Sequence, residues 1–154
     1  MRIALGGDHA GLGLKQLVGR RLNQLGHEVL DKGACEFVPT DDYPTFAFAV
    51  AESVSKGEAD RGIVVCGSGI GASIAANKVP GVRAGLVTDS YSAHQGVEHD
   101  DMNVLVLAGR VTGEAIAEEI LSSFLDAKFS GEDRHVRRLN MVLEIEREYS
   151  KKHG

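Results

Sequence analysis

The sequence has few of the residues that mark several large classes of protein. It contains two cysteines, Cys35 and Cys66, and no tryptophan. No apolar run approaches the ~20 residues that are needed to cross a bilayer. Two cysteines do not make a disulfide framework, and the first residues read as a strand rather than as a signal peptide. We therefore expect a reduced, cytoplasmic protein with no membrane partner.

The chain also lacks an excess of positive charge. Its 17 lysines and arginines are outnumbered by 22 aspartates and glutamates, which gives a net charge of −5. A nucleic acid is therefore not an expected partner, and an anionic ligand would need a local basic cluster. No cysteines and histidines have the spacing of a zinc site, so we expect no metal.

The chain does contain regularly spaced apolar runs, each followed by a longer segment with helical periodicity. This alternation is typical of βαβ units in a parallel sheet. A length of 154 residues suits one hydrophobic core, so we expect a single domain over residues 1–154. Strands are expected at 3–5, 28–30, 62–66, 84–87 and 104–108, and helices near 11–25, 44–56, 70–78, 91–98 and 113–126.

Two of these strands, 63–65 and 104–107, are apolar throughout, which predicts a central place with helices on both faces. A last amphipathic helix is expected from about residue 133. Its apolar stripe must cover either its own sheet or a second subunit, and we favour the second subunit.

The stretch from Cys66 to Ser73, which reads CGSGIGAS, carries the most information. Glycines between a buried strand and a helix predict a turn whose N–H groups can converge on an anion. The spacing matches neither a Walker loop, which ends in Gly-Lys-Ser/Thr, nor the dinucleotide fingerprint. A nicotinamide-dependent enzyme is therefore disfavoured, and no cofactor is expected.

Cys66 stands at the end of a strand beside a helix N-terminus, where the pKa of a thiol is expected to be lowered. A thiolate there could abstract a proton. The alternative is that Cys66 is a small buried apolar residue, which is the interpretation we adopt for Cys35.

Other polar residues follow the predicted strands or precede them. Asp8 and His9 follow the first strand, either as ligand-binding groups or as a helix N-cap with an exposed histidine. His99 lies in a polar run before a buried strand, which indicates either a solvated loop or an acid/base group.

Basic residues are concentrated late in the chain. Arg110 follows the fifth strand, and Arg134 and Arg138 are spaced i, i+4, so they project from one face of the last helix. Two guanidinium groups there could bind one phosphate, unless the segment is a solvated basic turn.

Together these residues form a pattern that resembles type B ribose-5-phosphate isomerases, within the ribose/galactose-phosphate isomerase family. The resemblance covers nearly the whole chain. The matching segments are GGDHAG near the start, TDDYP at 40–44, CGSGIGASIAANK at 66–78, YSA at 91–93, HDDMNVL at 99–105, GRV at 109–111 and RHVRR at 134–138.

The resemblance implies a Rossmann-like three-layer αβα sandwich with a five-stranded parallel sheet, which acts as a dimer or a dimer of dimers with active sites shared between subunits. It implies a small phosphorylated sugar as the ligand. Cys66 is then the base that moves the carbon-bound proton, and His99 the acid that opens the sugar ring. The implied binding residues are Asp8, His9, Tyr43, Gly67, Ser68, Gly69, Ile70, Gly71, Asp100, Arg110, Arg134 and Arg138.

Two features bear on the branch and the substrate. One branch of the family uses a glutamate base at the position of Ala72, so this chain resembles the thiol branch. Relatives commonly carry His-Asn where this chain has His99-Asp100, which leaves tetrose and hexose phosphates open as alternatives to a pentose phosphate. A non-catalytic phosphosugar-binding protein is an alternative from another class.

Overall fold

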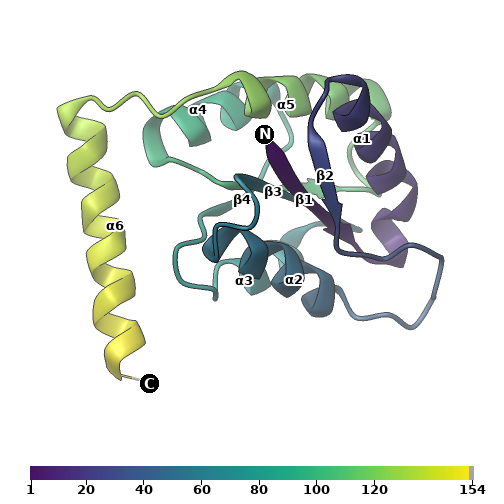
Figure 1. The fold of residues 1–154 in the computed structure, drawn as a ribbon, viewed down its shortest axis with the longest axis horizontal. Helices are drawn as coiled ribbons and strands as arrows, with labels where there is room; N and C mark the ends of the chain where they lie inside the picture. Colours follow the sequence, from purple (N-terminus) through teal and green to yellow (C-terminus); the bar gives the residue numbers. More distant parts are fainter. Residues whose placement is uncertain (153–154) are drawn as a thin grey trace.

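The computed structural model describes residues 1–152, and the order of its elements follows the predicted alternation of strands and helices (Figure 1). Each predicted strand and helix is found, with small differences at the ends. The strands are β1 (Arg2–Gly7), β2 (Glu28–Asp31), β3 (Arg61–Cys66), β4 (Ala84–Leu86) and β5 (Val104–Ala108). The helices are η1 (His9–Gly11, a 3₁₀ turn), α1 (Leu12–Gln24), α2 (Tyr43–Ser55), α3 (Ile70–Ala76), α4 (Ser90–Asp100), α5 (Glu114–Asp126) and α6 (Asp133–Lys152).

The five strands form one parallel sheet in the order β2-β1-β3-β5-β4. The central strand is β3, and it pairs with β5 from Gly62 opposite Val104 to Cys66 opposite Ala108. β3 is buried from Gly62 onward and β5 from Val104 onward, as their uninterrupted apolar sequences predicted. All five strands end at the same edge of the sheet, which is where parallel sheets bind ligands.

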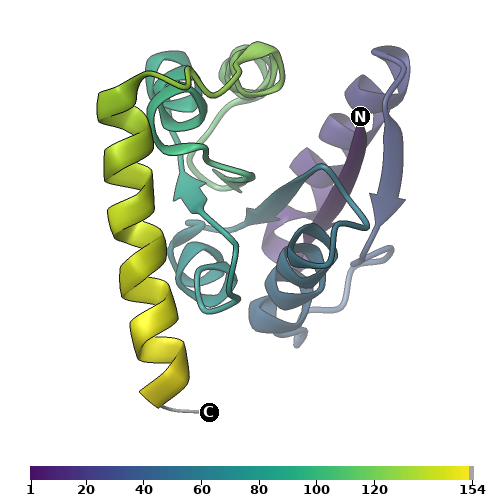
Figure 2. The ribbon, with the colours of Figure 1, turned by 60° about the vertical axis from the view of Figure 1, so that its left-hand side comes forward.

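Helices cover both faces of the sheet and give the expected three layers (Figures 1 and 2). Alternate residues of each strand face opposite layers. One core joins Ile3, Leu5 and Leu105 to α1, α4 and α5, and Phe124 of α5 is its largest buried side chain. The other core joins Val64 and Val106 to α2 and α3, and it includes Cys66.

The last helix, α6, is the least buried element. It lies along one side of the α/β body (Figure 2), and Glu146 accepts a hydrogen bond from the Gly81 main chain at 3.0 Å. Between α6 and the body is a groove of about 860 Å³, lined in part by Val82, Met102, Val142 and Ile145. The apolar residues Val136, Met141, Val142, Ile145 and Tyr149 remain exposed. Within residues 1–152, no helix combines the length and the apolar character needed to span a membrane.

Candidate active site

The carboxyl ends of β1, β3 and β5 meet at the segments that carry Asp8, Cys66 and Arg110. Cys66 ends β3, and the segments that follow β1 and β5 lie on either side of it. The main-chain N–H of Gly109 donates to the Cys66 carbonyl at 2.6 Å, and that of Arg110 donates to the Gly67 carbonyl at 3.0 Å. These bonds hold the turn after β3 against the turn after β5, so Arg110 and the glycine turn belong to one site.

Glycines allow the turn after β1 to approach β3 closely. A Cβ added at Gly11 would lie 2.0 Å from the carbonyl oxygen of Val65 and 2.4 Å from its carbonyl carbon. Any side chain at this position would push the turn away from the main chain of Cys66. The glycines of the GGDHAG motif therefore bring Asp8 next to the thiol, with His9 on the following turn.

Asp8 and His9 are held by different partners. The Asp8 carboxylate accepts a hydrogen bond from the Gly11 main chain at 3.1 Å. Asp8 therefore caps the following 3₁₀ turn, as the N-cap interpretation of the sequence predicted. His9 is bound to Asp41: both its Nδ1 (2.6 Å) and its main-chain N–H (3.1 Å) contact Asp41 Oδ1. We did not identify Asp41 from the sequence, although it lies in the TDDYP segment, because nothing local shows that this loop reaches His9.

The turn from Gly67 to Gly71 joins β3 to α3. Gly69 has a φ of +78°, and a Cβ there would lie 2.6 Å from Leu86, so a side chain is excluded on both counts. The exposed Ser68 hydroxyl accepts from the Ile70 main chain at 3.3 Å. The Tyr43 ring packs on Gly71, where an added Cβ would lie 2.4 Å from it. The turn therefore begins beside Arg110, at Gly67, and ends beside Tyr43, at Gly71.

The pKa of Cys66 differs from the expected direction. Its side chain is 4% exposed, and burial raises the pKa of the thiol to about 12. The negative charges of Asp8 and Asp41 raise the pKa further, and a hydrogen bond from the Asp8 main chain opposes them only in part. The prediction of a lowered pKa was wrong, because burial and the charges of the two carboxylates outweigh the hydrogen bond from the Asp8 main chain. In the single chain the thiol is neutral at pH 7.

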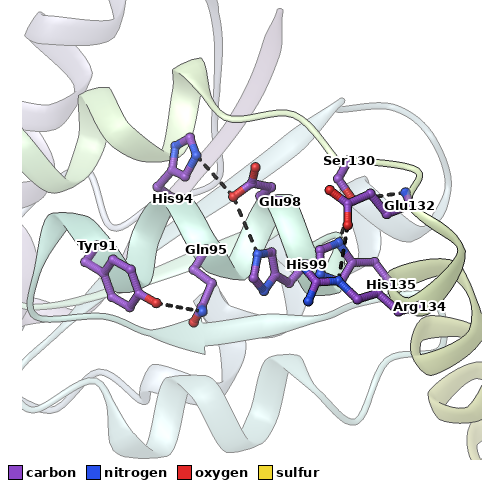
Figure 3. Close-up of polar contacts among 9 residues, drawn as sticks. All are labelled: Tyr91, His94, Gln95, Glu98, His99, Ser130, Glu132, Arg134 and His135. Carbon is purple, nitrogen blue, oxygen red and sulfur yellow. Dashed lines mark hydrogen bonds and ion pairs between the residues drawn. The ribbon is translucent and has the colours of Figure 1, made fainter.

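The remaining predicted residues lie elsewhere. His99 is in the last turn of α4, which extends two residues beyond its predicted end, and Asp100 is the final residue of that helix. Since α4 starts after the carboxyl end of β4 and returns to the start of β5, both residues lie at the amino edge of the sheet. Arg134 and Arg138 lie nearby, exposed on the first turns of α6. Figure 3 shows His99 beside Arg134 and His135, and no residue of the glycine turn belongs to this second group.

His135 is a second residue that the sequence analysis missed. Its ring stacks on the His99 ring with centroids 4.0 Å apart and planes inclined by 25° (Figure 3). Its Nδ1 is 2.6 Å from the Ser130 hydroxyl, and its Nε2 is buried without a hydrogen-bond partner among residues 1–152. Burial, followed by the charges of His99 and Arg134, lowers the pKa of His135. A neutral ring therefore supports one side of His99.

Only one cluster of described residues has the spacing of a metal site. Single ligand atoms of Asp8, His9 and Asp41 all lie within 4.8 Å of one another. However, Asp41 Oδ1 already accepts two hydrogen bonds from His9, and a carboxylate requires the proton on Nδ1. A metal on these atoms would have to displace that proton, so the hydrogen-bonded form suits the cluster better. A site without a metal stays a prediction.

Comparisons with known proteins identify the family of this chain. The family model described as Ribose/Galactose Isomerase matches residues 3–142. Ribose-5-phosphate isomerase B of Escherichia coli is 43% identical over 145 residues, which cover 94% of this chain and 96% of that protein. The structure of ribose-5-phosphate isomerase B from Clostridium thermocellum has a TM-score of 0.93 and 47% identity, covering 97% of this chain and 99% of that one.

A further solved structure, ribose-5-phosphate isomerase B from Mycoplasma genitalium with bound ribulose-5-phosphate, has a TM-score of 0.91 and 40% identity, and the match covers 96% of this chain and 97% of that one. The family model and these relatives span almost the whole chain. The resemblance inferred from the sequence motifs is confirmed, and this chain belongs to the ribose/galactose isomerase family.

Proposed function

We propose that this chain interconverts ribose 5-phosphate and ribulose 5-phosphate through a cis-enediolate, with Cys66 as the base. The observation that carries the proposal is the position of Cys66. It lies at the carboxyl edge of the central strand, against Asp8 and at the start of a glycine turn. Relatives at 40–47% identity are named ribose-5-phosphate isomerase B, and one of them holds ribulose-5-phosphate.

The residues around Cys66 meet the requirements of this reaction. The thiolate takes the proton from C2 of the aldose and returns it to C1. N–H groups of the turn from Gly67 to Gly71 stabilise the enediolate oxygen, at about 3 kcal/mol for each donor. The Ser68 hydroxyl helps to move protons between the two oxygens, and Asp8, His9 and Tyr43 bind the sugar hydroxyls. The chemistry needs no cofactor.

We further propose that each active site is shared by two copies of the chain, in a homodimer or a dimer of dimers. The ring-opening acid His99 and the phosphate-binding Arg134 and Arg138 lie at the opposite edge of the sheet from Cys66. A second copy can supply them, because α6 has an exposed apolar stripe that a partner would cover. Arg110 then binds the phosphate from the first copy.

The neutral state of Cys66 fits this assembly. A thiol with a pKa of about 12 is a poor base at pH 7. The arginines of a second copy would bring positive charge to a site where two carboxylates face the thiol, and nearby positive charge lowers the pKa of a thiol. We therefore place the active thiolate in the assembled enzyme rather than in the single chain.

The experiment that tests the function measures ribulose 5-phosphate formed from ribose 5-phosphate by the purified chain. Incorporation of deuterium at C1 or C2 from D₂O tests the chemical step directly. Binding of the sugar without turnover or exchange would favour a non-catalytic phosphosugar-binding protein and contradict the proposal.

A second candidate keeps the chemistry and changes the sugar to a tetrose or hexose phosphate. The observation that favours it is Asp100, an exposed carboxylate next to His99 where relatives commonly carry asparagine. Its charge would repel a phosphate and accept hydrogen bonds from hydroxyls. Values of kcat/KM for four-, five- and six-carbon sugar phosphates, measured for the wild type and for Asp100→Asn, decide between the two.

A further inference from the structure

Opening of a furanose ring needs a base as well as an acid. The acid protonates the ring oxygen, O4, while the base removes the proton from the anomeric hydroxyl, O1. His99 is the acid under the proposed function, and Cys66 is reserved for the carbon-bound proton. No residue has yet been assigned as the base that removes the anomeric proton. The pair formed by His9 and Asp41 has the geometry for this role.

Asp41 fixes both the position and the tautomer of His9. Its Oδ1 contacts Nδ1 at 2.6 Å and the main-chain N–H of His9 at 3.1 Å. A carboxylate only accepts hydrogen bonds, so Nδ1 carries the proton and Nε2 of the neutral ring has the free lone pair. Phe37 contacts the ring edge-on, with centroids 5.9 Å apart, which further limits its rotation.

The surroundings leave one face of this ring open to a ligand and place two carboxylates beside it. The His9 side chain is 25% exposed, so a ligand can reach it, and Nε2 has no hydrogen-bond partner among residues 1–152. Asp8 and Asp41 both place carboxylate oxygens within 4.8 Å of a His9 ring nitrogen. The second oxygen of Asp41, Oδ2, is buried and has no hydrogen-bond partner in the described chain, so its negative charge is uncompensated.

We propose that His9 is the base that takes the anomeric proton during ring opening, and that Asp41 is its positioning residue. The inference rests on the proposed isomerase function. His9 Nε2 takes the proton from O1, the electron pair of that O–H bond forms the C1=O1 double bond, and the C1–O4 bond breaks. O4 receives a proton from His99 of a second copy. His9 then releases its proton to solvent and His99 regains one, so the step is balanced.

The two directions of the reaction separate ring opening from the chemistry at carbon. Ribose 5-phosphate is mostly a closed furanose, whereas ribulose 5-phosphate cannot form that ring because its O5 carries the phosphate. Exchange of the C1 proton of ribulose 5-phosphate with D₂O therefore needs the proton-transfer base but no ring opening. A defect limited to ring opening lowers turnover of ribose 5-phosphate and leaves this exchange intact.

The test compares Asp41→Asn and Asp41→Ala with the wild type in both assays, with assembly and folding checked first. We expect kcat for ribose 5-phosphate to fall by about 10- to 100-fold, which is less than the about 10²- to 10⁴-fold effect of losing a base, because His9 itself remains. We expect C1 exchange from ribulose 5-phosphate to stay within about twofold of the wild type. The matched control is Glu36→Gln, which removes a carboxylate from the same loop; the exposed Glu36 has no polar partner within the described chain, so both rates should be unchanged.

Equal losses in the two assays would show that Asp41 only maintains the structure of the site, and would overturn the inference. Full turnover of ribose 5-phosphate by Asp41→Asn would overturn it as well. A wild-type enzyme that catalyses neither reaction would instead remove the proposed function itself, so the two failures are distinguishable.

Discussion

Cys66 and His99 lie at opposite ends of the strands: Cys66 at the carboxyl ends, and His99, in the helix α4, at the amino ends. Cys66 is the last residue of β3, whereas His99 is the second-last residue of α4, which runs back antiparallel to the strands. The 11 residues of α4 span about 16 Å, at about 1.5 Å per residue. No rotation of a side chain closes a gap of that size. If both residues act on one substrate, they come from different copies of the chain.

Mixing two inactive variants tests this arrangement. A site shared between copies pairs Cys66 of one chain with His99 of the other. Cys66→Ala and His99→Ala are each expected to be inactive, but a mixed dimer has one intact site. Random exchange of subunits at equal amounts should restore roughly a quarter of wild-type turnover, because about half of the dimers are mixed and each has one working site of two. The measurement is turnover after subunit exchange, together with a check that mixed dimers have formed. If mixed dimers are present and the mixture stays inactive, the site is not shared between copies.

Replacement of Cys66 by serine tests its role as the base. A serine hydroxyl is close in size but far less acidic, so proton abstraction should fail while the sugar still binds. We expect kcat to fall by about 10²- to 10⁴-fold with little change in KM. Steady-state kinetics measures both constants, with Cys35→Ser as the control, since Cys35 is exposed and lies outside the glycine turn. Near-normal turnover of Cys66→Ser would show that the base is another residue.

The raised pKa of Cys66 predicts a dependence of stability on pH. In the unfolded chain the thiol ionises near its ordinary pKa of 9.0, whereas in the folded chain it stays protonated up to about 12. The contribution of the thiol to stability is therefore fully present below pH 9. Between pH 9 and 12 the unfolded state binds fewer protons, so this contribution falls by up to about 1.4 kcal/mol per pH unit.

Because the raised pKa is that of the single chain, urea unfolding of wild type and Cys66→Ala at pH 7.5–10.5 measures this effect at protein concentrations low enough to keep the chain monomeric. The difference in the free energy of unfolding should narrow as the pH rises above 9, while Cys35→Ser follows the wild type throughout. A difference that does not change with pH would mean that the pKa of Cys66 is not raised.

Two glycines close together in sequence should respond in opposite ways to the same substitution. An alanine Cβ at Gly11 would lie 2.0 Å from the Val65 carbonyl oxygen, and main-chain atoms cannot move aside easily. Gly11→Ala should destabilise the fold by about 1–3 kcal/mol and lower kcat, because the shift reaches Cys66.

Gly13 is exposed in α1, with nothing within 4 Å of an added Cβ. Gly13→Ala should therefore be neutral or stabilise the fold by up to about 1 kcal/mol. Thermal unfolding of both variants checks this pair, and equal effects would contradict the close packing at Gly11.

The sequence determined the strands and helices and the end of the sheet at which the candidate site residues Cys66, Asp8 and Arg110 lie. Apolar runs such as 63–65 and 104–107 require helices on both faces, and parallel strands place their ends together, so Cys66, Asp8 and Arg110 were expected to meet. These inferences depend on local periodicity and on a general rule of parallel sheets. Their success follows from the fact that each pattern is contained within one segment of the chain.

Tertiary structure alone decided the contacts between distant segments. Asp41 reaches His9 across 32 positions, and His135 stacks on His99 from another helix, so no local pattern reports either contact. The direction of the Cys66 pKa was likewise set by burial and by two carboxylates from other loops. The return of α4 to the amino edge separated His99 from Cys66. Sequence fixes what each residue is able to do, but the proton affinity and the partners of a group depend on which atoms the fold brings around it.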